Sequence, residues 1–149
     1  MRRRTPGVLN TADLLDPQIV REENARAAEV VRALEPLATE RRRARVREVI
    51  AQRLSSVAVL FDAPHDPHNG AAVIRSCEAF GVQTLHVVER VERFLAASSV
   101  ARSAEQWVDV VCHQTADDAC SAVKGAGMEM VAAHPEGELL PEDLAASPR

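Results

Sequence analysis

Short apolar runs alternate with helix-like segments from residue 55 onward, and this alternation is the strongest constraint on the fold. The run Val57–Phe61 is continuously apolar and too short for a buried helix, which is typical of a strand covered on both faces. Parallel βα units with right-handed crossovers produce such an alternation. We therefore predict an α/β fold with a parallel, Rossmann-like sheet. Its expected strands are 57–61, 84–88, 107–111 and 128–133, and its expected helices are 71–80 and 116–126.

The residues before this unit have a helical periodicity instead. We predict an irregular arm over 1–20, a helix over 21–35 that Pro36 interrupts, and a second helix over 40–54. Two parts of the chain follow from this change of pattern. They are an N-terminal arm with basic helices, residues 1–54, and an α/β unit, residues 55–149.

The formal charge is distributed unevenly along the chain. Residues 1–54 hold 12 Arg against 8 Asp and Glu, a balance of +4, and residues 55–149 hold 6 Lys and Arg against 14 Asp and Glu, a balance of −8. The net charge of −4 argues against a nucleic-acid ligand for the chain as a whole, whereas the basic N-terminal part keeps one open. Six arginines of the second predicted helix indicate either a contact with an RNA backbone or a solvated helix face. They are Arg41, Arg42, Arg43, Arg45, Arg47 and Arg53.

Composition and cysteine usage limit the remaining classes of protein. No stretch approaches the roughly 20 apolar residues of a membrane-spanning helix, so we expect no membrane partner. The basic start Met1–Arg4 has no apolar run behind it and makes a poor secretory signal. The three cysteines, Cys77, Cys112 and Cys120, are odd in number and form no CxxC pair. This usage favours a reduced, cytoplasmic setting.

Four potential metal ligands gather between the first predicted strand and the helix that follows it. They are Asp62, His65, Asp66 and His68. No complete ligand set at a known metal-binding spacing is present. We therefore expect a polar loop and no metal ion.

The same loop leads into a helix through a compact motif. Its residues are Asp66-Pro67-His68-Asn69, and Arg75 follows Asn69 by six positions. Asn69 is a strong candidate for the helix N-cap, because a side-chain oxygen at that position accepts from the free N–H groups of the first turn. Arg75 then lies in the second turn and points back toward the N-terminal end. A guanidinium beside a helix N-terminus, in the loop after a parallel strand, predicts a place for a phosphate.

The motif resembles one from a known family of RNA-modifying enzymes. The loop Asp66–Asn69, the pair Ile74-Arg75 and the closing Phe80-Gly81-Val82 are similar to the first motif of the SpoU/TrmH RNA ribose 2′-O-methyltransferases. The segments Ser103–Val108 and Leu140–Leu144 are also similar to that family. The resemblance implies a SPOUT-type sheet with an N-terminal helical extension. It makes the α/β unit the N-terminal part of a SpoU-type methyltransferase domain.

The resemblance also implies an activity. This is methyl transfer from S-adenosylmethionine to a ribose 2′-hydroxyl, with a guanosine in the D-loop of tRNA as the expected substrate and a homodimer as the expected assembly. Arg75 and Asn69 occupy the catalytic positions of the family motif. Arg75 either assists loss of the hydroxyl proton or clamps a phosphate, and both interpretations stay open because arginine is almost never deprotonated in proteins. The expected RNA contacts are Arg41, Arg42, Arg43, Arg45 and Arg102.

Family members carry further segments that hold the methyl donor. These are a Gly-x-Glu segment and a Ser-Leu-Asn segment, which build a deep C-terminal knot, and neither follows the predicted strand 128–133 in this sequence. We therefore expect an incomplete methyltransferase without cofactor-binding residues. Two alternatives are a ribosomal RNA 2′-O-methyltransferase of the same family and a non-catalytic remnant that binds RNA or forms dimers.

Overall fold

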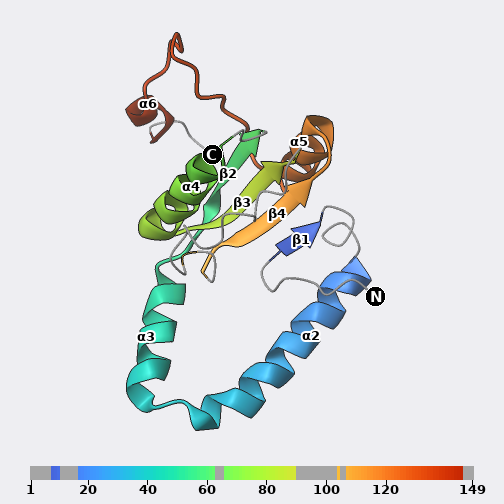
Figure 1. Cartoon of the computed structure of the whole chain (residues 1–149), viewed down its shortest axis with the longest axis vertical. Helices are drawn as coiled ribbons and strands as arrows, with labels where there is room; N and C mark the ends of the chain where they lie inside the picture. The colour runs from blue at the N-terminus through green and yellow to red at the C-terminus, as the bar shows by residue number, and fades with distance from the viewer. Residues whose placement is uncertain (1–7, 11–16, 63–65, 90–103, 105–106, 146–149) are drawn as a thin grey trace.

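The computed structural model describes residues 8–10, 17–62, 66–89, 104 and 107–145. An α/β unit forms one part of it, and two helices extend from one end of that unit (Figure 1). No helix within the described residues is both long enough and apolar enough to cross a membrane. All three cysteines are free thiols.

The α/β unit is built on a four-stranded sheet in which every pair of neighbouring strands is parallel. The strand order is β1-β4-β3-β2. The strands are β1 (Val8–Asn10), β2 (Leu54–Asp62), β3 (Val82–Val88) and β4 (Asp109–His113). In the middle of the sheet, Val59, Leu85 and Val110 lie side by side on three adjacent strands. The parallel arrangement confirms the predicted α/β fold.

Two helices cover opposite faces of this sheet. The buried core beneath α4 (Pro67–Phe80) includes Ala71, Ile74, Cys77, Leu85, Val87, Val108 and Val110. The helix α5 (Ala116–Gly125) buries Ala119 and Val123 and contacts β3 and β4. Successive strand residues point to opposite faces, so His86 and His113 lie on the α5 side. A last short helix, α6 (Pro141–Ala145), follows an extended segment.

The predicted helices before the sheet are present. The first, α2 (Pro17–Leu34), begins four residues before the predicted start, because proline suits the first turn of a helix. Pro36 ends the regular helix as predicted, and Glu35–Leu37 form a 3-10 turn, η1. Every α2 side chain that the structure describes is exposed. In Figure 1, α2 and α3 form the two arms of a V that points away from the sheet.

The second helix, α3 (Glu40–Ala51), ends three residues before the predicted end, because Leu54 already belongs to β2. The N–H of Leu54 donates to the carbonyl oxygen of Gly81 at 2.7 Å. Gly81 is the C-cap of α4 with φ 77°, and a Cβ atom there would lie 2.7 Å from the carbonyl oxygen of Gln52. Both the left-handed conformation and the close approach require glycine at this position.

Two predictions at the margins of the sheet are wrong. Residues 128–133, expected as a strand, pair with no described strand, and Val131 is 56% exposed. The position beside β4 is occupied by β1, which lies within the stretch 1–20 that we expected to be irregular. A strand exists only where a neighbour completes its backbone hydrogen bonds, and that neighbour is chosen by the tertiary fold.

The third predicted strand is displaced by two residues. It was expected at 107–111, whereas β4 comprises Asp109–His113. Trp107 lies in a turn, where its N–H donates to the carbonyl oxygen of Ala104 at 3.0 Å, and this turn delays the strand. As a result, β4 ends on a buried histidine, His113.

Candidate functional site

The polar motif after β2 forms the first turn of α4. Asp66 is the N-cap, and its Oδ1 accepts from the backbone N–H of His68 at 2.8 Å. The carbonyl oxygen of Asp66 accepts from the N–H of Asn69 at 3.0 Å. The predicted N-cap, Asn69, is therefore wrong, because Pro67 takes the first helical position and the residue before it becomes the cap. The side chain of Asn69 is exposed on the third residue of the helix.

Arg75 and Asn69 share the outer side of α4, where both are exposed. Six residues separate them, which corresponds to a rise of about 9 Å and leaves their side chains about 120° apart around the helix axis. Helical side chains tilt toward the N-terminus, so the Arg75 side chain leans back toward the turn that carries Asn69. The structure therefore brings the two catalytic candidates to one surface, at opposite margins of it.

His68, which the sequence indicated only as a potential metal ligand, is a further polar residue of this surface. It is exposed and lies seven residues before Arg75, which places both side chains in one row along the helix. Ala72 is exposed between them and adds only a methyl group. The seven-residue spacing within one helix was the signal that could have identified His68, but the predicted helix began only at residue 71.

The buried histidines beneath α5 do not take part in this surface. His86 Nδ1 and His113 Nε2 lie 2.9 Å apart, and the ring centroids are 5.1 Å apart. Burial lowers the pKa of His86, and the neighbouring His113 lowers it further. Burial also lowers the pKa of His113, against a smaller opposing effect of Asp118. Both rings are therefore neutral near pH 7, and their hydrogen bond joins β3 to β4.

The thiols of Cys77 and Cys112 are unsuited to nucleophilic chemistry. Burial, together with the charge and hydrogen bond of Glu89, raises the pKa of the Cys112 thiol to about 12. Burial likewise raises the pKa of Cys77 in the core. A thiol of raised pKa is a poor source of thiolate. Among the described residues, no group of three or more His, Cys, Asp or Glu side chains is arranged to hold a metal ion.

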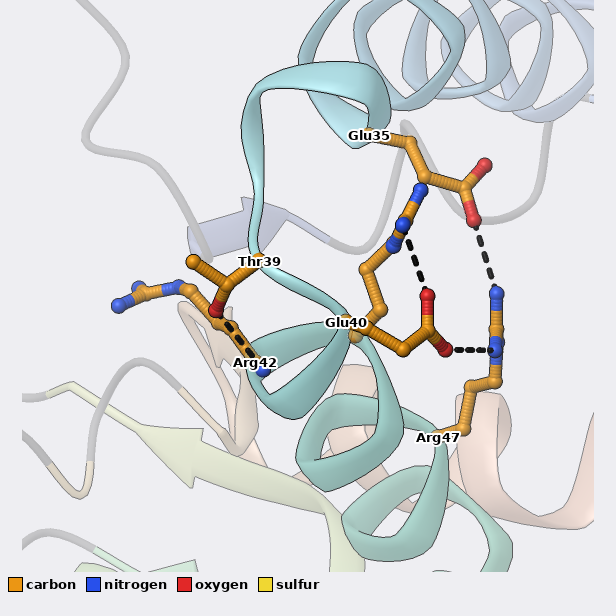
Figure 2. A network of polar contacts seen from close by, with 6 residues as sticks. Glu35, Thr39, Glu40, Arg42 and Arg47 are labelled. Carbon is orange, nitrogen blue, oxygen red and sulfur yellow. Dashed lines mark hydrogen bonds and ion pairs between the residues drawn. The ribbon is translucent and has the colours of Figure 1, made fainter.

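The arginines of α3 form a second, separate polar surface. Some of them form ion pairs with a carboxylate and others do not. Arg43 pairs with Glu40 at 2.7 Å and Arg45 with Glu48 at 2.9 Å. Figure 2 shows Arg47 between two carboxylates, at 3.0 Å from Glu35 and 3.6 Å from Glu40.

Arg53 has a structural role that its sequence position did not indicate. Its side chain is only 9% exposed, lies 3.7 Å from the Glu78 carboxylate and donates to the Glu78 carbonyl oxygen at 3.4 Å. This contact satisfies a carbonyl group in the last turn of α4. Arg53 is thus withdrawn from the predicted basic cluster.

Arg41 and Arg42 are the α3 arginines that pair with no carboxylate within the described part of the chain, and both are exposed. In Figure 2 the Arg42 side chain points away from the ion-pair network. Arg102, the fifth predicted RNA contact, lies outside the described residues.

The first turn of α4 and the arginines of α3 lie beyond opposite ends of β2. α3 leads into the amino end of this strand, and α4 begins after its carboxyl end (Figure 1). The nine residues of β2 span about 30 Å at the usual rise per strand residue. A single ligand that contacts both surfaces must therefore be a large one.

Comparison with known proteins assigns the segment that carries Asn69 and Arg75 to a protein family. A family model described as the SpoU rRNA Methylase family matches residues 56–147. The chain belongs to the SpoU methylase family. The match covers β2 from residue 56 onward, α4 and the elements that follow, and it leaves β1, α2 and α3 outside.

Two relatives of this chain are named as tRNA methyltransferases. The tRNA (guanosine(18)-2′-O)-methyltransferase of Escherichia coli (strain K12) is 38% identical over 93 residues, which are 62% of this chain and 41% of that protein. The enzyme of the same name from Thermus thermophilus is 31% identical over 94 residues, 63% of this chain and 48% of that protein. The chain therefore spans less than half the length of these relatives.

A solved structure shows the same fold. The A. aeolicus TrmH/SpoU tRNA modifying enzyme superposes with a TM-score of 0.51 at 24% identity, over 59% of this chain and 45% of that one. Together with the family match, this likeness confirms the resemblance to the SpoU/TrmH family that the motif indicated.

S-adenosylmethionine is the donor that the family implies. Ligands of open α/β sheets bind at the carboxyl ends of the strands. Of the positive-φ glycines of the described chain, Gly81 follows α4 and precedes the amino end of β3, whereas Gly127 follows α5 and precedes residues that form no strand. Residues 129–140, which follow α5, are exposed throughout and form no cradle. None of these residues is therefore assigned to the donor.

Proposed function

We propose that this protein takes part in ribose 2′-O-methylation of tRNA, at a guanosine of the D-loop, and that the described residues supply its RNA-facing part. The observation that supports the proposal is the exposed surface of α4 within the family-matched segment, where Asn69 lies in the first turn, after the carboxyl end of β2, and Arg75 lies six residues further along the helix. The activity named for the relatives supports the choice of tRNA and guanosine. The donor implied by the family is S-adenosylmethionine.

Arg75 acts, in this proposal, as a clamp and not as a base. A ribose hydroxyl is a weak nucleophile until its proton leaves, and a base must be able to take that proton. A guanidinium remains charged in proteins, but its fork binds a phosphate through two hydrogen bonds and stabilises developing negative charge. Arg75 would thus hold the nucleotide in place, while the Asn69 amide, exposed one to two turns away, orients the ribose.

The distance between the two polar surfaces supports a structured RNA as partner. Residues 1–54 form, in this proposal, an RNA-binding extension, and residues 55–149 form the N-terminal part of the methyltransferase domain. A folded tRNA is large enough to reach from α3 to the start of α4, whereas a short single strand has to stay extended over about 30 Å. We also propose a cytoplasmic location and a homodimeric assembly, as the resemblance to the SpoU/TrmH family implies.

The decisive experiment measures methyl transfer and its position. The protein is incubated with labelled S-adenosylmethionine and an unmodified tRNA transcript, and the RNA is digested and analysed by mass spectrometry. We expect a 2′-O-methylguanosine in the D-loop, lost on Arg75→Ala and largely retained on Ser76→Ala, a neighbouring exposed residue. Arg75→Lys keeps the charge but loses the two-pronged contact, so full turnover in that variant would contradict the clamp.

A second candidate function is 2′-O-methylation of ribosomal RNA. The matching family model is described by that substrate, which favours this alternative independently of the relatives. Transfer to ribosomal RNA and not to tRNA in the same assay would select it. Salt-dependent RNA binding with no transfer and no heat of S-adenosylmethionine binding would instead select a non-catalytic RNA-binding protein.

A further inference from the structure

We propose that Arg43 and Arg47 are positioning residues that hold the corner between α2 and α3, and that Arg41 and Arg42 are the α3 side chains that contact RNA phosphates. This inference rests on the proposed function, because it concerns the RNA-binding role of α3. It divides a basic cluster that looks uniform in the sequence into two kinds of arginine.

The network joins residues on both sides of the corner. Arg47 contacts Glu35 in η1, twelve residues earlier, at 3.0 Å, and its other terminal nitrogen lies 3.6 Å from Glu40 at the start of α3. Figure 2 shows that both carboxylates approach the same guanidinium. A contact across twelve residues and a turn constrains the chain path, which a pair within one helix does not.

A cap and a second arginine complete the corner. Thr39 is the N-cap of α3, and its Oγ1 accepts from the N–H of Arg42 at 3.3 Å. The remaining oxygen of Glu40 pairs with Arg43 at 2.7 Å. The Arg43 side chain is 32% exposed, and its Nε atom is buried without a hydrogen-bond partner in the described structure. Arg43 is therefore turned toward the corner and not fully toward solvent.

The charges of this region show where a phosphate is attracted. Five arginines and three glutamates lie between residues 35 and 48, a balance of +2. Arg43, Arg45 and Arg47 each have a carboxylate partner, so the uncompensated charge resides on Arg41 and Arg42. A phosphate that approaches Arg47 also meets Glu35 and Glu40, whose repulsion offsets the attraction.

The ion-pair network affects the orientation of α2 relative to α3 more than it affects the stability of the fold. Exposed ion pairs contribute little to the stability of a domain. The α2 side chains that the structure describes are all exposed, so α2 has few packing contacts to set its direction. The contacts of Glu35, Glu40 and Arg47 then determine how the V of Figure 1 presents Arg41 and Arg42.

The test is a double-mutant cycle on the full chain with an unmodified tRNA transcript as probe. Kd is measured over a range of salt concentrations for Glu35→Gln, Arg47→Gln and the double variant. We expect each to weaken binding by about two- to threefold, with no further loss in the double variant and an unchanged salt dependence, since no phosphate contact is removed. The matched variants Arg41→Gln and Arg42→Gln should weaken binding by about three- to tenfold and reduce the salt slope by about one each.

A direct phosphate contact by Arg47 gives the opposite pattern. Arg47→Gln would then reduce the salt slope as much as Arg42→Gln, and Glu35→Gln would tighten binding by freeing the guanidinium. Either result overturns the inference while the proposed function stands. If the wild-type chain shows no salt-dependent tRNA binding, the proposed function fails first, and the two failures are thus distinguishable. Unchanged helical circular dichroism in all variants shows that these surface changes leave the fold intact.

Discussion

Single residues connect local backbone geometry to the packing of distant segments, and Gly81 does so most directly. Its φ of 77° ends α4, and its missing side chain lets the Gln52 carbonyl oxygen approach from the end of α3. The same residue accepts the N–H of Leu54, which starts β2. One position therefore ties α3, β2 and α4 together.

We predict that Gly81→Ala lowers the free energy of unfolding by more than about 2 kcal/mol, because it adds both left-handed strain and a clash. Two matched glycines separate these causes. Gly127 has φ 76° but open space around a Cβ, so its alanine variant should lose only about 1 kcal/mol. Gly125, at the end of α5, has neither constraint, so Gly125→Ala should change the free energy of unfolding by less than about 1 kcal/mol. Urea denaturation measures all three, and equal losses at 81 and 125 would contradict the explanation.

At the scale of elements, α4 is the helix that presents the candidate site, and its first turn decides which residues are available. Asp66 and Pro67 supply the cap and the first helical residue. The cap frees the Asn69 side chain, which would otherwise be bound to the backbone. Because Asp66 caps the helix, the Asn69 side chain is not needed as a cap and is available for a functional contact.

We predict that Asp66→Ala destabilises the protein by about 1 kcal/mol, the usual cost of losing an N-cap. Asn69→Ala should cost less than about 0.5 kcal/mol, as for an exposed residue without a structural contact. Chemical denaturation followed by circular dichroism compares the two variants. A larger loss for Asn69→Ala would restore Asn69 as the cap and weaken its proposed contact with the ribose.

At the scale of the whole molecule, stability depends on contacts that bring several elements together beneath α5. The His86–His113 pair is buried where β3, β4 and α5 meet. Both rings have a lowered pKa in the folded chain, whereas the unfolded value is 6.5. The unfolded chain therefore binds more protons than the folded chain below this pH.

Because the folded chain binds fewer protons at these histidines, we predict that their contribution to the free energy of unfolding is complete above pH 7. This contribution is lost as the pH falls below about 6.5. Urea denaturation between pH 8 and pH 5 should show a falling free energy of unfolding. The double variant His86→Leu/His113→Leu should flatten this dependence, and His134→Leu, at an exposed position, should leave it unchanged. Asp118 opposes the effect at His113, so Asp118→Asn should make the loss steeper. An equal pH dependence in the double variant and the wild type would show that other groups cause it.

Local sequence patterns determined much of this protein. The apolar run at 57–61, the glycine after α4 and the Asp66–Asn69 motif predicted the parallel α/β unit and the surface that carries Arg75. The parallel sheet confirms the α/β unit, and the family match to residues 56–147 confirms the family resemblance of the motif. These features depend on the period of a helix or strand and on turn chemistry, which a few neighbouring residues encode.

The tertiary structure alone decided which of several equivalent residues take which role. It pairs β1 with β4 and leaves residues 128–133 without a strand partner. It also withdraws Arg53 into the fold and binds Arg47 to Glu35 across twelve residues. Strand pairing and ion pairing act through space between residues far apart in the chain, so identical side chains acquire different roles only when the fold sets their neighbours.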